Sequence, residues 1–98
     1  MSTAKNFNHQ KAAMARLVLA ERNRDAAQTM IGFTLAQERK AVIEVLQCDD
    51  DTPAYAAATE RLDEARKACA RATTAFHEAY GRIDAIKGEC VKLGVLQT

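Results

Sequence analysis

The sequence predicts an all-α protein, a long antiparallel hairpin of two helices that meet along a heptad seam of small residues. The first observation is a 3.5-residue apolar repeat, which is typical of a helix that packs along its length against another helix. The repeat comprises Tyr55, Ala58, Leu62, Ala65, Cys69, Ala72, Phe76, Ala79, Ile83, Ile86, Cys90 and Leu93. The second is a ladder of small residues seven apart, at Ala13, Ala20, Ala27, Thr34 and Ala41. The third is a turn-forming segment between the two repeats.

The first helix is expected over about residues 4–47. Gly32 lies midway along it, and a glycine costs about 1 kcal/mol relative to alanine in a helix interior. Because the periodicity continues on both sides of Gly32, we expect the helix to run through it. The alternative is a kink at this glycine, which would give a three-helix arrangement.

The turn is expected at residues 48–52, and the second helix over about 53–92. Thr52 is a suitable N-cap, and Pro53 suits the first helical position because its φ is already fixed near the helical value. A glycine then ends the second helix and leaves a short tail over 94–98. The 98 residues are expected to form a single domain.

The two ladders of small residues also predict a register. In an antiparallel pair of helices, the numbers of facing residues add up to a constant. Pairing Ala41 with Ala58, and Ala20 with Ala79, gives 99 in both cases, which centres the bend in the predicted turn. We therefore expect small residues to face small residues across a close seam.

Apolar residues outside the seam predict self-association, because a lone hairpin of this size buries little apolar surface. One set flanks the seam of the first helix, at Met14, Val18, Leu35, Val42 and Leu46. Another stripe lies farther round the same helix, at Leu19, Met30 and Phe33. Since a helix that is apolar on several faces has several neighbours, we expect a homodimer, completing a four-helix bundle through the first set, and a partner protein on the second. Alternatively, the second stripe is itself the dimer core.

Charge is distributed unevenly, although the net charge of +1 creates no strong field that would attract nucleic acid or a membrane surface. The open end of the predicted hairpin is basic and its turn end acidic, so the opposite ends of two copies would attract each other. The seam residues Arg24 and Glu38 would then meet across subunits. The basic end is also a candidate nucleic-acid face, with acidic residues interleaved. Its residues are Lys5, Lys11, Arg16, Arg82, Lys87 and Lys92.

The three cysteines, Cys48, Cys69 and Cys90, are spaced 21 residues apart. Along a helix this spacing is about 31 Å, too far for a disulfide. The odd number of cysteines favours a reducing compartment, with Cys69 and Cys90 as small core residues. There is no apolar signal core and no apolar run of membrane-spanning length. We expect a cytoplasmic protein without membrane association, in the host cytoplasm if it is phage-encoded.

The sequence offers no catalytic, cofactor-binding or metal-binding constellation. His9 and His77 are the only histidines, and neither has the spacing of His-Glu-x-x-His or Glu-x-x-His metal sites. The predicted register places His9 opposite Cys90, but a nucleophile and its base would need a third group to orient them. No phosphate-binding glycine loop or nucleophile elbow is present. We therefore expect neither an enzyme nor a cofactor.

Short segments resemble known hairpin families. Thr52-Pro-Ala-Tyr55, followed by Leu62, resembles the start of the second helix of small type VII secretion substrates. Tyr80-Gly-Arg-Ile-Asp84 fits the Tyr-x-x-x-Asp/Glu export pattern of that family, whereas its Trp-x-Gly turn is replaced by Asp49-Asp-Asp51. The turn is also similar to that of type III secretion needle subunits, and the seam looks like that of Rop, an RNA-binding plasmid hairpin that dimerises. These resemblances imply a secreted or polymerising hairpin, and a dimer.

The function expected from these features is that of a non-enzymatic module that binds another protein, as an inhibitor, adaptor or assembly subunit. Such small helical modules are common among phage-encoded proteins directed against the host, which is an analogy of size and type. The alternatives are a nucleic-acid-binding hairpin dimer that uses the basic open end, and a secretion-system hairpin subunit or substrate.

Overall fold

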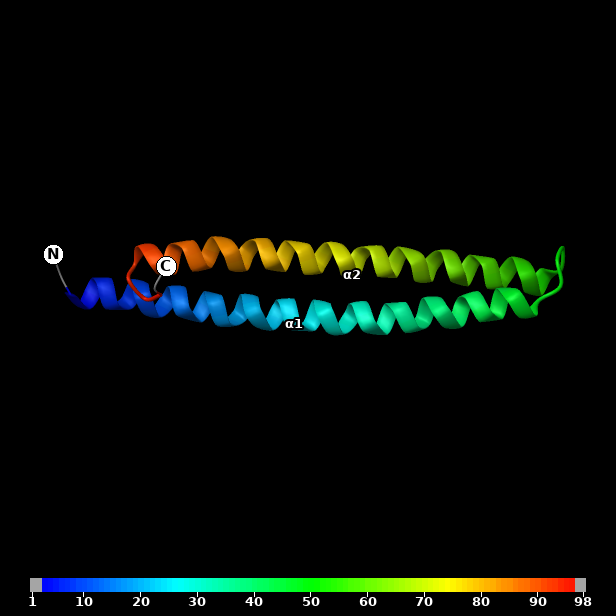
Figure 1. Cartoon of the computed structure of the whole chain (residues 1–98), viewed down its shortest axis with the longest axis horizontal. Coiled ribbons are helices and arrows are strands. Elements are labelled where there is room, and N and C mark those ends of the chain that lie inside the picture. The colour runs from blue at the N-terminus through cyan, green and yellow to red at the C-terminus, as the bar shows by residue number, and fades with distance from the viewer. Residues whose placement is uncertain (1–2, 97–98) are drawn as a thin grey trace. The chain divides into compact units, whose positions relative to one another are not determined.

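The computed structural model describes residues 3–96, and the side chains of 7–96, as two long helices packed as an antiparallel hairpin (Figure 1). Helix α1 spans Thr3–Gln47 and helix α2 spans Pro53–Lys92, and no strand occurs among the described residues. The predicted fold class is confirmed. Helix α1 is unbroken at Gly32, so the alternative with a third helix is not adopted.

The turn between the helices is closed by local hydrogen bonds. Asp51 adopts a left-handed conformation with φ of 63°, which an aspartate tolerates better than most residues do. The Thr52 hydroxyl donates a hydrogen bond to Asp49 O (2.8 Å) and accepts one from the Tyr55 N–H (3.1 Å). Thr52 is therefore the N-cap of α2, as predicted, with Pro53 at the first helical position.

Replacing Thr52 by alanine is expected to lower the free energy of unfolding by about 1 kcal/mol, because the Tyr55 N–H loses its acceptor. The measurement is urea denaturation followed by circular dichroism. Thr73→Ala is the control, since the Thr73 hydroxyl bonds only to Cys69 O within the helix and alanine is the better helix former. Equal losses in the two variants would contradict the capping role.

The C-terminal segment folds back onto the helices. Gly94 has φ of 78°, and its N–H donates to Val91 O (3.0 Å), while the Val95 N–H donates to Cys90 O (2.9 Å). These bonds satisfy carbonyls at the end of α2, as in a Schellman-type cap. Val95 and Leu96 pack against buried core residues, so the described part of the predicted tail belongs to the core. The last two residues of that prediction lie outside the described residues.

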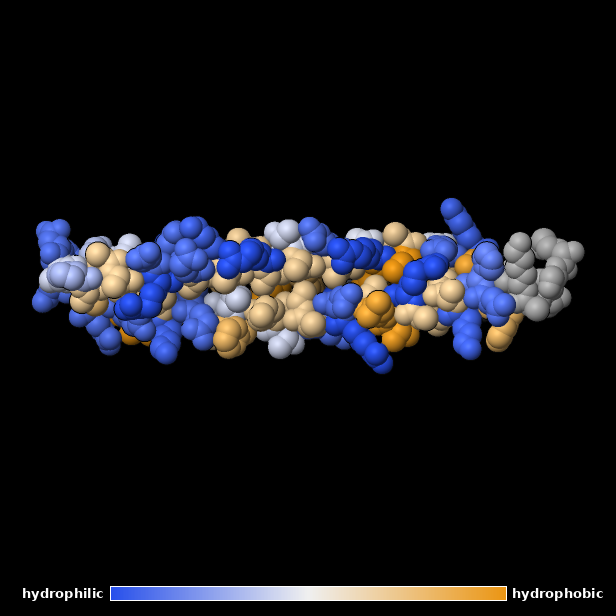
Figure 2. All heavy atoms as spheres, turned by 180° about the vertical axis from the view of Figure 1, so that it is seen from behind, coloured by the Kyte–Doolittle hydropathy of each residue, from blue (hydrophilic) through white to orange (hydrophobic). Residues whose placement is uncertain are grey.

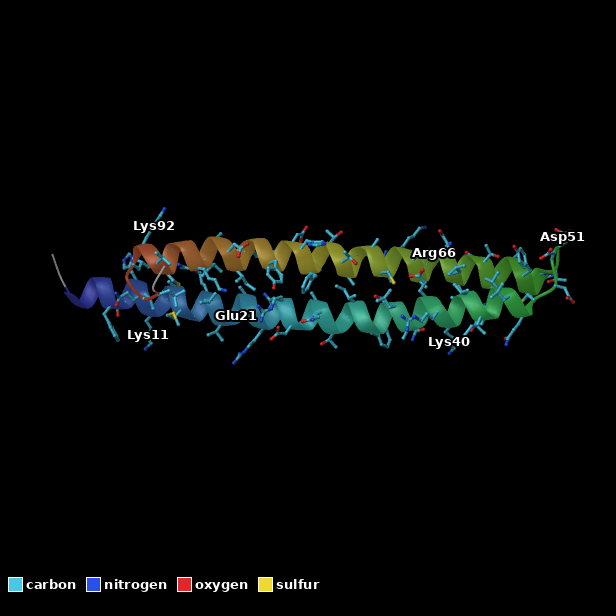
Figure 3. All side chains as sticks on the ribbon, viewed as in Figure 1. Lys11, Glu21, Lys40, Asp51, Arg66 and Lys92 are labelled. Carbon is cyan, nitrogen blue, oxygen red and sulfur yellow. The ribbon has the colours of Figure 1, made fainter. Side chains whose placement is uncertain are left out.

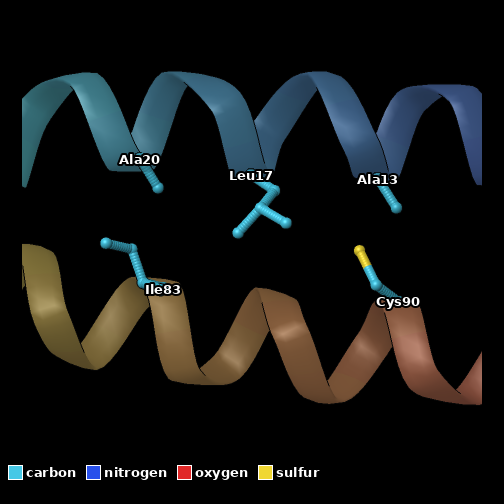
Figure 4. Close-up of a cluster of buried hydrophobic side chains, with 5 residues drawn as sticks. All are labelled: Ala13, Leu17, Ala20, Ile83 and Cys90. Carbon is cyan, nitrogen blue, oxygen red and sulfur yellow. The ribbon is translucent and has the colours of Figure 1, made fainter. Parts of the chain in front are cut away.

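The contacts group the chain into two compact units. The open-end unit comprises Met1–Ala26 and Phe76–Thr98, and the turn unit comprises Ala27–Ala75. In the open-end unit the core is a cluster of Ala13, Leu17, Ala20, Ile83 and Cys90 (Figure 4). In the turn unit the buried residues are Thr34, Ala41, Ala58, Leu62 and Ala72. These core residues lie on the predicted seam, except Leu17, which belongs to neither predicted repeat.

The register differs from the predicted one by about one helical turn. Residues that contact each other across the two helices have numbers that add up to between 103 and 107 rather than to 99. The pairs are Gln10 with Leu93, Arg24 with Tyr80, Glu38 with Arg66 and with Cys69, and Glu44 with Arg61. Accordingly, Ala20 faces Ile83 and Ala13 faces Cys90 (Figure 4). The expectation that Ala20 lies level with Ala79 is wrong.

The physical reason for the observed register is the burial of the larger side chains. In the open-end unit the observed register places Ile83 opposite the small residue Ala20, and in the turn unit Leu62 is buried. The predicted register would have set Leu62 opposite Gln37, and Ile83 opposite Arg16, both of which are exposed. Small residues facing larger ones fill the space between the helices and bury more apolar area than alanine facing alanine.

Candidate interaction surfaces

Helix α1 exposes large apolar side chains in the turn unit. Their exposed fractions are 52% for Met30, 58% for Phe33, 42% for Leu35, 54% for Ile43 and 78% for Leu46. Figure 2 shows apolar atoms lying between charged side chains on one face of the molecule. So many large apolar side chains left in solvent on one helix segment mark a binding surface more often than a solvated face.

These side chains lie on two flanks of α1. The Leu35 flank surrounds a shallow pocket of about 420 Å³. The pocket is lined by Leu35, Glu38, Arg39, Val42 and Ile43. Arg39 is exposed and forms no ion pair among the described side chains. This flank therefore combines aliphatic surface with one free positive charge.

The Met30 flank continues into a groove of about 670 Å³ between α1 and α2. Its walls are Gln37, Lys40, Ala41 and Glu44 of α1, and Ala57, Glu60, Arg61, Glu64, Ala65 and Ala68 of α2. Gln37 and Lys40 come seven residues after Met30 and Phe33, which is two helical turns, so all four share one side of α1. The groove is open because α2 carries alanines where longer side chains would fill it.

The predicted dimer and partner residues are divided between the two units. In the open-end unit, Leu19 is exposed at 58%, Val18 is exposed at 43%, and Met14 packs against the buried cluster. Part of Met14 is thus already covered by its own hairpin, contrary to the expectation that one hairpin cannot cover it. In the turn unit, Val42 is half-buried and Leu46 is exposed. Whether these residues bind a second copy or a partner stays a prediction.

The candidate nucleic-acid residues do not form a common basic face. Lys11 of α1 and Lys92 of α2 point away from the seam in opposite directions (Figure 3). Arg16 forms an ion pair with Glu89, so part of the positive charge is neutralised. Arg82 is 3.9 Å from Glu78, Lys87 is exposed, and the side chain of Lys5 lies outside the described residues. Nucleic-acid binding stays a prediction.

The charged seam residues find partners within their own chain. Arg24 lies 5.9 Å from the centre of the Tyr80 ring and 3.0 Å from Asp25. Glu38 lies 3.7 Å from Arg66, and its Oε2 accepts a hydrogen bond from Cys69 Sγ at 3.3 Å. Arg24 therefore does not require Glu38 of another subunit, because Asp25 on α1 compensates the Arg24 charge and Arg66 on α2 compensates that of Glu38.

The cysteines and histidines form no reactive site. Cys90 is fully buried, whereas Cys69 is half-buried against Glu38, so only the first is a core residue as predicted. His9 and His77 are exposed, and His9 is not brought to the buried thiol. Within residues 3–96, no group of three His, Cys, Asp or Glu side chains is placed to hold a metal ion.

Lys67 lies among acidic neighbours on the surface of α2. The Lys67 pKa is raised, first by its hydrogen bond to Asp63 and then by the charges of Asp63 and Glu64. This cluster is fully solvated on the outer side of α2, where such pairs contribute little to stability. It is a helix-surface feature and has no catalytic arrangement around it.

The export-like pattern has an internal structural role. The Tyr80 ring packs edge-on against Phe76, with 5.2 Å between the ring centres, and lies under Arg24. Asp84, the acidic member of the pattern, is exposed on α2. The Tyr80 side chain is therefore partly engaged in contacts within the hairpin. An export role for the pattern stays a prediction.

Sequence reasoning missed two parts of these surfaces. Ile43 lies outside the heptad positions considered for the dimer face, yet it borders the pocket beside Leu35. Ile43 comes four residues after Arg39 and three before Leu46, and residues at these spacings are neighbours on a helix surface. This spacing could have placed Ile43 beside them. The groove on the other flank was missed because Ala57 and Ala68 look like ordinary helix formers, and they line a groove only in the observed register of the two helices.

Neither helix in the described part of the chain is both long and apolar enough to span a membrane. No protein-family model, curated protein or solved structure matches the chain.

Proposed function

We propose that the chain is a non-enzymatic interaction module that binds another protein through the Leu35 flank of the turn unit. The observation that supports the proposal most directly is the exposure of Leu35 and Ile43 at a shallow pocket, with Leu46 exposed one helical turn after Ile43. A helix presenting aliphatic side chains one turn apart fits the apolar face of a partner helix or sheet. The free guanidinium of Arg39 would meet a carboxylate at the edge of that partner surface.

The expected partner is a folded protein that has an apolar patch with acidic residues at its edge. The role would be that of an inhibitor, adaptor or assembly subunit, acting in the cytoplasm, or in the host cytoplasm if the chain is phage-encoded. The basic residues of the open-end unit support nucleic-acid binding less well, because Arg16 and Arg82 have acidic neighbours on α2.

The test is affinity capture from a lysate of the cells in which the chain occurs, with the tagged chain as bait. Ile43→Glu is expected to retain less than about a tenth of the protein captured by the unaltered chain, because a charge would enter the centre of the apolar contact. The captured protein is identified by mass spectrometry and quantified for each bait.

Thr74→Glu is the matched control. It adds the same charge to an exposed position on α2 of the same unit, away from the Leu35 flank, and should retain the captured protein. If Ile43→Glu and Thr74→Glu capture the protein equally well, or if the unaltered chain captures nothing specific, the proposal is wrong.

A further inference from the structure

The Met30 flank of the turn unit carries both halves of a self-complementary contact. Met30 and Phe33 project from α1 with more than half of each side chain exposed. The groove lies on the same side of the helix, where Gln37 and Lys40 come two helical turns after Met30 and Phe33. An apolar projection next to an apolar-floored hollow is the arrangement required for two copies to fill each other's groove.

The spacing suits a two-fold axis. The projecting pair is centred about nine residues before the centre of the groove on α1, or about 14 Å at 1.5 Å per residue. If α1 of a second copy runs antiparallel, with the axis midway near Gln37, Met30 of each copy reaches the groove of the other. The Gln37 amide lies close to that axis, where it can both donate to and accept from its own symmetry mate.

The charges along α2 are complementary under the same operation. The observed register places Arg71 level with the projecting pair, whereas Glu60 and Glu64 line the groove. Neither Arg71 nor Glu60 forms an ion pair among the described side chains. The two-fold axis that brings Met30 to the groove also carries Arg71 of each copy to the span between Glu60 and Glu64 of the other.

We propose that the Met30 flank binds a second copy of this chain in an isologous dimer. In this dimer Met30 and Phe33 of each protomer enter the alanine-floored groove of the other, and Arg71 pairs with Glu60 and Glu64 of the other protomer. The interface is isologous, so every contact is made twice. The proposal does not rest on the proposed function, since the Leu35 flank lies on the other side of α1 and stays free in the dimer.

The first test is sedimentation equilibrium of the purified chain at micromolar concentration. The unaltered chain is expected to be a dimer, and Met30→Asp is expected to be a folded monomer, because its side chain is exposed within one hairpin and circular dichroism should be unchanged. Leu46→Asp is the matched control on the other flank and should remain a dimer. A monomeric unaltered chain, a dimeric Met30→Asp, or a Leu46→Asp variant that dissociates would each overturn the proposal.

The second test uses the charges and does not alter the apolar contact. Arg71→Glu alone places a negative charge against Glu60 and Glu64 at both ends of the interface. The double variant Glu60→Arg with Glu64→Arg places two positive charges against Arg71 at both ends. Each is expected to raise the dimer dissociation constant about tenfold or more, since symmetry makes every substitution act twice. Mixing the two variants restores opposite charges at both ends, so native mass spectrometry should detect mainly the mixed dimer. A random mixture of species would overturn the assigned geometry.

Discussion

Replacing Ile83 by alanine is expected to lower the free energy of unfolding by about 2–5 kcal/mol, the usual cost of removing a large aliphatic side chain from a core. Ile83 is 1% exposed and belongs to the cluster that holds the open-end unit together. Few residues share this core, so its neighbours cannot close the cavity cheaply. Urea denaturation followed by circular dichroism gives the change. A loss below about 1 kcal/mol would contradict the burial of Ile83 in solution.

The same position tests the register, because Ile83 faces Ala20 (Figure 4). Ala20→Ile alone should overpack the seam by about 1–3 kcal/mol. Combined with Ile83→Ala, it should be more stable than the sum of the single effects by about 1 kcal/mol, since the added and removed side chains share one space. The double variant Ala20→Ile with Ala79→Gly is the control, and its change in the free energy of unfolding should equal the sum of the two single changes. Coupling in the control alone would support the register of small residues against small residues.

Replacing Gly32, Gly81 and Gly88 together by alanine is expected to raise the free energy of unfolding by about 1.5–3 kcal/mol. Each glycine lies within a helix, and an added methyl group meets nothing within 4 Å. Glycine in a helix interior costs about 0.5–1 kcal/mol relative to alanine, and effects at separate sites add. The measurement is again urea denaturation.

Gly94 provides the control for the glycine substitutions. It also has open space around it, but its φ of 78° is unfavourable for alanine. Gly94→Ala should therefore destabilise the chain by about 1 kcal/mol, although it adds the same methyl group. If the triple variant gained nothing, α1 and α2 would not be continuous helices at these positions in solution.

The helices and the turn were predictable because their signals are local. A heptad repeat, an N-cap threonine and a proline act within one or two turns of chain, so Thr52 and Pro53 could be placed without knowing the partner helix. The register was not predictable from the small residues alone. It depends on how the larger side chain of Ile83 packs opposite Ala20, which is a property of both helices together.

The exposed residues of the candidate surfaces were also largely predictable, since Met30, Phe33 and Leu35 break the polar pattern expected of a solvated helix face. The groove beside Met30 was not. The sequence does not distinguish an alanine in a seam from one on a surface. The groove lined by Ala57 and Ala68 forms only when α1 packs beside α2 in the observed register.

The folded-back C-terminal segment has a consequence for thiol chemistry. Val95 and Leu96 pack over the cluster that contains Cys90, whose side chain is fully buried, whereas Cys48 and Cys69 are each partly accessible. An alkylating reagent can therefore reach Cys90 only while this end of the hairpin is transiently separated. The rate at which Cys90 is modified measures how often that separation occurs, so the chain contains its own reporter of local opening.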